Sequence, residues 1–508
     1  MTMKNTSNQT TSVGAPTKEG ATLDATQIAL CRFGLGARPS DMLHIASDPH
    51  GYLLRQLAAP KLALLESPTL PTTDLIFRKQ RAADEMVRRM REAQPQSTPT
   101  TPMIATANAM VPPNAMASGN SMTASPSPKP TDQKPKASKL FQDQMYEDEV
   151  KARLDRWMKT DTPLLERLVQ FWMNHFTVSA GKNGFITASI GAFEREAIRP
   201  YILSKFETML LAVEQHPVML IYLDNQNSVG PNSRAGNNGA KGLNENLARE
   251  ILELHTLGVD GGYTQADVTS FARILTGWIY TDPNNDDVYG GRFTFAPNRH
   301  EPGDVSVIGK TYAESGKDQG ENALRDFARH PSTARHIAVK LAKAFVADDP
   351  PPSLVAKLEA TFLKSEGDLA VVTKTLIDAP ESWSTAQDKL RSPDEFIIAA
   401  MRAGNIPLDQ GPFLNALNVL GTPLWRATGP NGYPVDSSSW LAPENIAMRA
   451  DLSVQLAHEV QSLVEPESFA ATILGKRISA ETRQALQRAA SREQAFALLF
   501  MSPEFQRR

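Results

Sequence analysis

Residues 244–278 read NENLAREILELHTLGVDGGYTQADVTSFARILTGW and hold an acid-rich helical segment, a Gly-Gly turn and a second helical segment. Thr264, with Asp267 three residues later, matches a capping box, which predicts that a new helix begins directly after the turn. The stretch therefore predicts two helices joined by a short turn, and most of the remaining chain has the same helical character.

The segment around residue 163 illustrates this helical character. Pro163 follows Thr162 as expected at a helix start, and the apolar residues that follow have the spacing of a core-facing helix: Leu165, Leu168, Val169, Trp172 and Phe176. Convincing strand material is confined to 292–295 and 305–308. We predict an all-α fold, one large multi-helical body with a small β hairpin element near 290–312.

The organisation of the chain follows from changes in composition. Residues 1–23 are polar and predict a disordered tail, and 24–93 predict the helical N-terminal part of the main body. Residues 94–138 are rich in Pro, Ser and Met and predict a disordered insertion. The main helical body is predicted over 139–508.

Composition and charge exclude several classes of protein. The 508 residues carry a net charge of -3 without a long basic block, so we expect no nucleic-acid partner. No apolar run is long enough for a membrane span, and the N-terminus lacks the apolar region of a signal peptide. Cys31 is the single cysteine, so no internal disulfide can form. These features favour a cytoplasmic protein, with an unusual export route left open.

The common catalytic motifs are missing, so the candidate residues come from polar clusters. Asn246, Arg249, Glu250 and Glu253 share one face of the predicted 244–257 helix, whereas His255 falls on the opposite face if the helix is straight. Two carboxylates on one face can bind a divalent metal ion if other elements add ligands. The alternative is a solvated face held by ion pairs.

Three histidines occur in suggestive contexts, His175 in WMNHF, His255 in ELHTLG and His300 in NRHEPG. Imidazole can bind a metal or exchange protons near neutral pH, although a packed histidine more often donates a hydrogen bond to a carbonyl. His300 with Glu301 lies in a turn-rich loop, where functional groups are common, and is the strongest candidate for reactivity.

Several long blocks of the chain resemble the bacterial domain-of-unknown-function family 1800: RFGLGARP (32–39), FWMNHF (171–176), the region 242–268 and LGTPLWRATGPNGYP (420–434). The resemblance runs from about residue 24 to the C-terminus and implies no mechanism. It implies an association with a neighbouring phosphatase-like or sulfatase-like family. It also implies that a set of motif positions acts together, namely Asn244, Asn246, Arg249, Glu250, Glu253, His255, Tyr263, Asp267, His300 and Glu301.

The favoured hypothesis is a hydrolase that uses a metal ion or an acid–base pair, with its site built from residues 244–267 and the 298–303 loop. The catalytic candidates are Glu250, His300, His175 and Arg249. The metal-ligand candidates are Glu250, Glu253 and His300. The candidates for binding a small-molecule or polymer substrate are Asn244, Asn246, His255 and Tyr263.

The competing hypothesis is a non-catalytic binding partner or scaffold, for instance for the phosphatase-like or sulfatase-like neighbour. It predicts an exposed aromatic surface at Trp425, Tyr433 and Trp440. The alternative for these residues is that their side chains hold a Pro/Gly-rich loop against the core.

Overall fold

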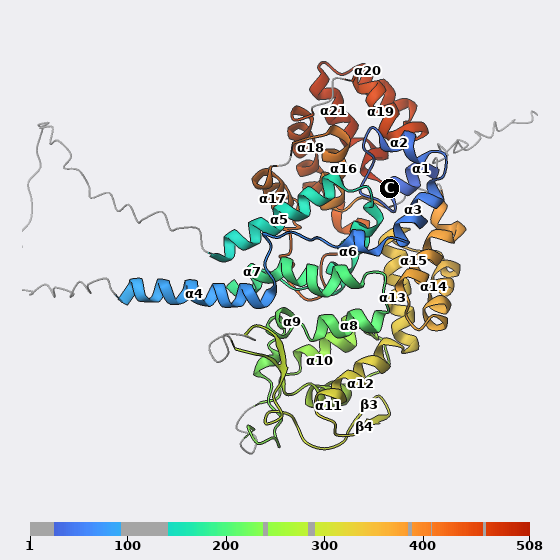
Figure 1. Cartoon of the computed structure of the whole chain (residues 1–508). Helices are drawn as coiled ribbons and strands as arrows, with labels where there is room; N and C mark the ends of the chain where they lie inside the picture. The colour runs from blue at the N-terminus through green and yellow to red at the C-terminus, as the bar shows by residue number, and fades with distance from the viewer. Residues whose placement is uncertain are drawn as a thin grey trace, which may run out of the picture.

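The computed structural model describes residues 25–92, 141–236, 242–282, 290–384, 389–407, 409–460 and 464–508. This part of the chain is all-α, with two small antiparallel sheets of two strands each, as predicted (Figure 1). The segments predicted to be disordered, 1–23 and 94–138, lie outside the described residues.

The N-terminal helices lie on one side of the body, except for a long helix that projects away from it (Figure 1). That helix is α4 (Thr73–Glu92), which contacts the body mainly through its first turns on α7. The other helices of this region are α1 (Ala25–Cys31), α2 (Asp41–Ile45), α3 (Pro49–Leu57) and the 3-10 helix η1 (Pro60–Ala63).

The middle of the molecule is built from helices that pack closely on one another, with α5 against α7 as the most extensive pair. These elements are α5 (Phe141–Lys159), α6 (Pro163–His175), α7 (Gly184–Phe193), the π-helical turn η2 (Glu194–Ile198), η3 (Arg199–Tyr201), α8 (Phe206–Glu214), α9 (Pro217–Tyr222) and η4 (Asn225–Asn227). The apolar stripe predicted on α6 is fully buried, which confirms that this helix faces the core.

Below these helices lie α10 (Asn246–Glu250), the π-helical turn η5 (Ile251–His255), α11 (Gln265–Ile274) and α12 (Lys317–Ala328). Strand β1 (Trp278–Tyr280) pairs with β2 (Phe293–Phe295), and β3 (Val305–Val307) pairs with β4 (Lys310–Tyr312). The two predicted strands thus form, but each has a different partner. The hairpin in the predicted region is β3–β4.

The C-terminal half forms the top of the body and, below α1 and α3, the same right-hand side (Figure 1). Its elements are α13 (Pro331–Phe345), α14 (Pro352–Lys364), α15 (Leu369–Asp378), η6 (Pro380–Trp383), α16 (Pro393–Gly404), α17 (Gln410–Val419), η7 (Ser437–Trp440), α18 (Pro443–His458), α19 (Pro466–Leu474), η8 (Gly475–Arg477), α20 (Ala480–Gln487), α21 (Arg492–Met501) and α22 (Pro503–Gln506). Helices α16 and α17 pack on α5, so residues far apart in the sequence meet near the centre.

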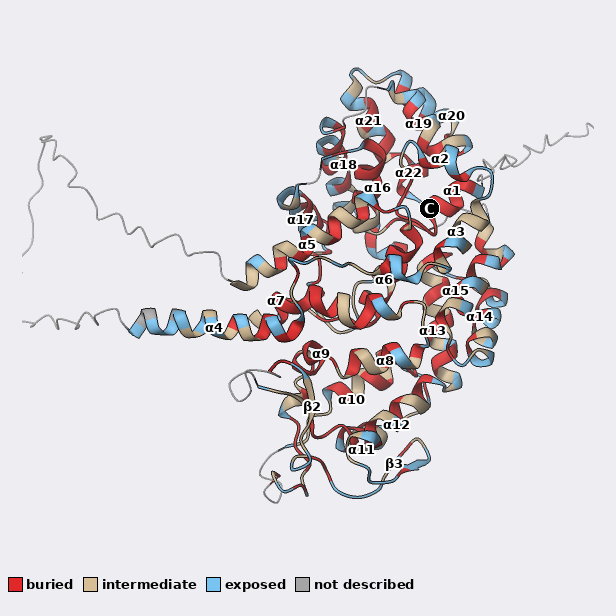
Figure 2. Cartoon of the chain, viewed as in Figure 1, coloured by how far each residue is buried: buried red, intermediate tan, exposed pale blue. Residues whose placement is uncertain are grey.

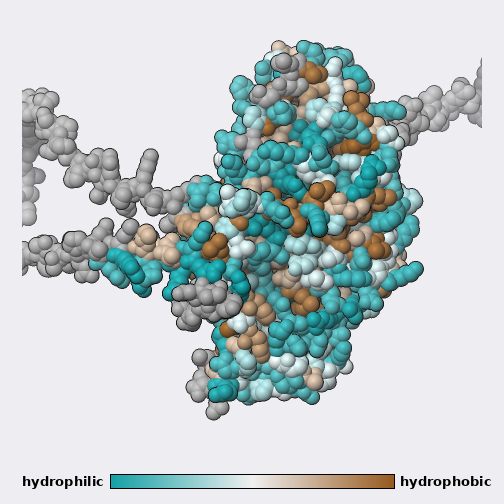
Figure 3. All heavy atoms as spheres, in the orientation of Figure 1, coloured by the Kyte–Doolittle hydropathy of each residue, from teal (hydrophilic) through white to brown (hydrophobic). Residues whose placement is uncertain are grey.

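One hydrophobic core extends from Ile28 to Phe505, and the inner faces of the helices are buried throughout (Figure 2). The face seen in Figure 3 is mainly hydrophilic, with apolar side chains in separate small groups. Within the described residues, none of the helices is both long and apolar enough to cross a membrane.

A buried charge network joins α5, α6 and η2. Arg199 contacts Glu166 and Glu194, each at 2.8 Å, and Arg153 contacts Glu194 at 2.7 Å. Burial lowers the pKa of Arg153, whereas the nearby Glu194 acts to raise it. Because removing one partner from such a network leaves an uncompensated buried charge, the network fixes the position of Arg153 in the interior.

Candidate functional site

The predicted acidic face lies at the junction of α10 and η5. Glu250 and Glu253 are half-buried, and burial raises the pKa of Glu250, with a further increase from Glu253. Arg249 does not pair with either carboxylate: it contacts Glu245 at 3.2 Å and Gln265 at 2.8 Å. The ion pair on this helix is therefore Arg249–Glu245, while Glu250 accepts no hydrogen bond from the described residues.

The expectation of a straight helix through residue 257 is wrong, because residues 251–255 form a π-helical turn. His255 at the end of this turn is fully buried, and its Nδ1 lies 2.8 Å from Oε1 of Glu214 on α8. His255 also contributes electrostatically to lowering the pKa of Glu250. Single π turns are frequent at functional sites, but this one has no signal in the sequence.

The predicted substrate-binding residues have mainly local partners. The Asn244 side chain donates to the Asp224 carbonyl at 3.2 Å and accepts from the Asn246 backbone N–H at 2.9 Å, so it secures the start of α10. Tyr263 is half-buried, and its pKa is raised by burial and by Glu253.

His300 and Glu301 fasten a loop. The Nδ1 of His300 donates to the Thr276 carbonyl at 2.8 Å. Glu301 accepts hydrogen bonds from the backbone and side chain of Asn232, at 2.8 and 2.5 Å, and its own N–H donates to Thr276 Oγ1. These bonds hold residues 230–236 against the segment that follows β2.

The structure does not gather Glu250, Glu253 and His300 into one ligand set. Across the described ranges, no three His, Cys, Asp or Glu side chains are grouped as a bound metal ion would require. Glu250 and Glu253 influence one another, whereas His300 has Glu314 as its neighbour, with Nε2 3.5 Å from Oε2.

Three histidines meet in the interior. The ring centroid of His175 lies 6.1 Å from that of His255 and 6.1 Å from that of His336. His175 Nε2 donates to the His255 carbonyl at 3.1 Å, and His336 Nε2 donates to the Leu254 carbonyl at 3.1 Å. Burial lowers the pKa of His336 to about 4 and places that of His175 well below its usual value, so both rings are neutral at pH 7.

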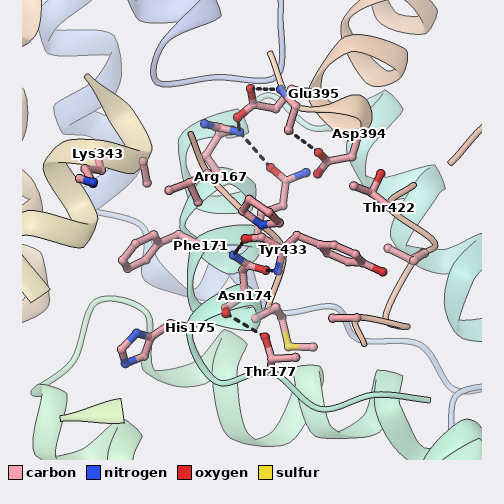
Figure 4. Close-up of a pocket in the computed structure, with 18 of the residues that line it drawn as sticks. Arg167, Phe171, Asn174, His175, Thr177, Lys343, Asp394, Glu395, Thr422 and Tyr433 are labelled. Carbon is pink, nitrogen blue, oxygen red and sulfur yellow. Dashed lines mark hydrogen bonds and ion pairs between the residues drawn. The ribbon is translucent and has the colours of Figure 1, made fainter. Parts of the chain in front are cut away.

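His175 also lines a cavity of about 200 Å³ whose lining residues come from α5, α6, α13, the start of α16, residues 417–440 and Arg508 (Figure 4). For comparison, an apolar cavity of about 150 Å³ admits benzene. The cavity can therefore hold a small organic molecule. Its apolar walls include Phe171, Phe345 and Leu417.

Basic side chains outnumber acidic ones in this lining, six to two. The basic residues are Arg153, Arg167, Lys340, Lys343, Lys389 and Arg508, and the acidic ones are Asp394 and Glu395. Glu395 is bound by both Arg167 and Arg508. Burial opposes its ionisation, but the two guanidinium groups outweigh burial and hold the pKa of Glu395 at about 2.

The lining also carries buried N–H groups that no protein atom accepts from, within the described residues. They are Arg153 Nε, Trp157 Nε1, Arg167 Nε, Gln170 Nε2 and Trp425 Nε1. Each such group costs roughly 1–3 kcal/mol when it is left without an acceptor. Five such groups belong to residues of this one lining, so a ligand in the cavity would meet several unused hydrogen-bond donors.

Three of these donors belong to one stack, which we call the tryptophan cradle: Arg153, Trp157 and Trp425. The guanidinium of Arg153 lies 4.5 Å from the ring centroid of Trp157 and 5.0 Å from that of Trp425. Trp425 has φ of 54°, a left-handed conformation that costs a non-glycine residue roughly 1–3 kcal/mol. Local strain of this kind is concentrated at functional sites.

The 420–440 segment closes the cavity on one side. Asn174 Nδ2 donates to the Tyr433 carbonyl at 2.9 Å, and the Tyr433 N–H donates to Asn174 Oδ1 at 2.8 Å (Figure 4). Trp425 and Trp440 are buried, so the exposed aromatic surface expected of a scaffold is wrong for these two residues. The aromatics hold the loop against the core, as the alternative prediction stated.

Sequence reasoning identified His175, Trp425, Tyr433 and Trp440 but missed the basic residues of the cavity. Arg153, Arg167 and Lys340 come from three helices and resemble surface residues of amphipathic helices when read singly. One signal in the sequence was Arg167, a charged residue within the helix that was predicted to face the core. A charge at such a position indicates a buried polar site.

The fold and the cavity define a mainly helical protein with a pocket lined by basic residues and hydrogen-bond donors. A family model described as protein of unknown function (DUF1800) matches residues 28–507, nearly the whole chain, so the chain belongs to this family. No curated protein and no solved structure matches it.

Proposed function

We propose that the protein binds a small organic anion in the cavity beside α6. The observation that carries this proposal is the set of five buried N–H donors without acceptors in one lining. A carboxylate, phosphate or sulfate group supplies several acceptor oxygens at once, and its hydrogen bonds to charged donors are stronger than neutral ones. The anionic group would lie against the tryptophan cradle.

The remaining walls suit the organic part of such a ligand. Phe171, Phe345 and Leu417 offer apolar contact, which contributes roughly 25 cal/mol for each Å² of apolar surface removed from water. Asp394 lies near Thr422, away from Lys343 (Figure 4). Its carboxylate would favour a hydroxyl or amino group of the ligand on that side.

The proposal can be tested by isothermal titration calorimetry with benzoate, phenyl phosphate and phenyl sulfate. Trp425→Phe removes one cradle donor and keeps an aromatic ring, so it should weaken binding about tenfold. Trp278→Phe is the matched control, because Trp278 Nε1 is equally buried and lacks an acceptor but lies outside the cavity. Failure of all three probes to bind the unmodified protein would overturn the proposal, as would equal weakening by the two variants.

A second candidate function is hydrolysis at the α10–η5 junction. It is favoured by Glu250, a half-buried carboxyl whose pKa is raised and which has no hydrogen-bond partner among the described residues. A general acid needs a carboxyl with a raised pKa. The charge of Glu250 also helps to raise the pKa of Tyr222 and of Tyr263, so both hydroxyls lie near this carboxyl. A screen with chromogenic esters should then give activity that Glu250→Gln abolishes and Glu245→Gln keeps. Activity retained by Glu250→Gln would exclude this assignment.

A further inference from the structure

Lys340 differs from the other basic residues around the cavity. Each of the other five has a carboxylate partner: Arg153 with Glu194, Arg167 and Arg508 with Glu395, Lys343 with Asp436, and Lys389 with Asp348. Lys340 has no carboxylate within 4 Å in the described part of the chain.

The surroundings of Lys340 offer no compensation for its charge. His175 from α6 and His336, one turn earlier on α13, are neutral, and Lys340 itself contributes to lowering the pKa of both. The other charged or titratable groups beside Lys340 and around the cavity are His255 on η5, Lys343 on α13, and Arg153, Arg167, Lys389, Asp394, Glu395, Tyr433 and Arg508. Burial lowers the pKa of Lys340 to about 8.

Lys340 is half-buried, so its unpaired ammonium loses part of its hydration, a cost that an anionic partner would offset. The residues that the structure describes supply none within 4 Å, whereas Lys340 lines the same cavity as the tryptophan cradle. Lys340 acts on the pKa of His175 and His336, whereas the charges that act on Arg153 come from other residues, so the ammonium and the cradle occupy different parts of the lining. A ligand that only occupied the cradle would leave the ammonium unpaired.

We infer that the ligand is a dianion, with one anionic group in the tryptophan cradle and a second paired with Lys340. This inference rests on the proposed function and names its ligand class: an organic molecule with two carboxylate, phosphate or sulfate groups at separate ends of a small apolar body. The neutral His175 Nδ1, buried without a partner, can accept a hydrogen bond from a ligand hydroxyl beside the second group.

Proton linkage gives the inference a distinct signature. The pKa of Lys340 is about 8 in the free protein, and an anion beside the ammonium would raise it. At pH 8.5 much of the free protein carries the neutral amine, so binding of the second anionic group would take up a proton. A monoanion that bound only in the tryptophan cradle would take up no proton.

The experiment compares benzoate with the three benzenedicarboxylate isomers, which place the second carboxylate at different separations. Titration calorimetry at pH 8.5 in Tris and in TAPS reports proton uptake, because these buffers differ in ionisation enthalpy. We expect one isomer to bind at least about tenfold more tightly than benzoate and to take up a proton. Lys340→Met should reduce its affinity far more than that of benzoate and abolish the uptake.

Lys357→Met is the control, because it removes an ammonium on α14 that is paired with Glu381 and lies outside the cavity lining. Two results would overturn the dianion inference but not the proposed anion site. One is that benzoate binds and no isomer binds more tightly. The other is that Lys340→Met weakens the dicarboxylates no more than it weakens benzoate. No binding by any of the four compounds, together with none by phenyl phosphate or phenyl sulfate, would overturn both.

Discussion

The backbone carbonyl of Trp425 accepts a hydrogen bond of 2.8 Å from the N–H of Ala180, which fastens the strained residue to the turn between α6 and α7. The Trp425 ring also packs edge-on against Tyr146 at 6.0 Å, and the Tyr146 hydroxyl donates to the Leu424 carbonyl at 2.8 Å. These contacts determine where Trp425 Nε1 lies before any ligand arrives. A preorganised donor loses little entropy on binding.

The turn that carries Tyr433 should tolerate no side chain at Gly432. Its φ is 74°, and a Cβ there would lie 2.6 Å from the Asn174 carbonyl oxygen. Gly432→Ala should lower the free energy of unfolding by roughly 1–3 kcal/mol and weaken anion binding, because Asn174 holds the loop that closes the cavity. Urea denaturation and the benzoate titration measure these two effects. Gly421→Ala, also at positive φ but with open space around the Cβ, should cost less and leave binding intact.

Glu395 is expected to stabilise the fold through its two guanidinium partners. Glu395→Gln should destabilise the protein by roughly 3–5 kcal/mol, since Arg167 and Arg508 would lose their shared buried partner. Its folded pKa of about 2 lies below the unfolded value of about 4.3, so this stabilisation is present above pH 4.3 and is lost as the pH falls toward 2. Urea midpoints between pH 3 and 7 should record the loss. Glu359→Gln, at the surface pair with Arg335, is the control and should leave the profile unchanged.

Glu250 should behave in the opposite sense. Its pKa is raised by burial, so the ionised form is less favourable in the folded protein than in the unfolded chain. The Glu250 carboxyl therefore destabilises the folded protein little at low pH, where it is protonated. The destabilisation grows as the pH rises through the raised pKa. Glu250→Gln should keep or slightly raise the melting temperature at pH 7, with less effect at pH 4. A fall in melting temperature at pH 7 would restore the ion-pair interpretation of this helix face.

The hydrogen bonds that Asn232 donates to the Glu301 carboxylate should limit the access of proteases to the loop around residue 234. Glu301→Ala removes both acceptors. We therefore expect trypsin to cleave the folded variant after the exposed Arg234 several times faster than it cleaves the unmodified protein. Glu359→Ala, at a surface ion pair with Arg335, is the control. Unchanged cleavage in Glu301→Ala would show that other contacts hold the loop.

Local signals in the sequence predicted much of the fold. The Thr264–Asp267 capping box forms as expected, and the apolar stripe of α6 is buried, because both depend on residues within a few positions of one another. The strands at 293–295 and 305–307 were also placed correctly, and a hairpin, β3–β4, forms in the predicted region, but the sequence did not indicate that 293–295 pairs with β1. Pairing depends on which segment lies alongside, and short alternating runs do not encode it.

The cavity could not be predicted for the same physical reason. Arg153, Arg167 and Lys340 acquire their shared environment only when α5, α6 and α13 meet, and a single sequence contains no measure of that proximity. The π-helical turn at 251–255 changed the angular relation of His255 to Glu250, which a uniform helical wheel cannot represent. Whether the residues proposed from 244–267 catalyse a reaction remains a prediction.

The shared salt bridge of Arg167, Glu395 and Arg508 joins α6, α16 and the last residue of the chain at the wall of the cavity. No short fragment could contain this wall, because Glu395 is 228 residues from Arg167 and 113 from Arg508 in the sequence. A bound anion would therefore slow global unfolding and not merely stiffen one region. The concentration of its ligand would then set the lifetime of the folded protein against proteolysis.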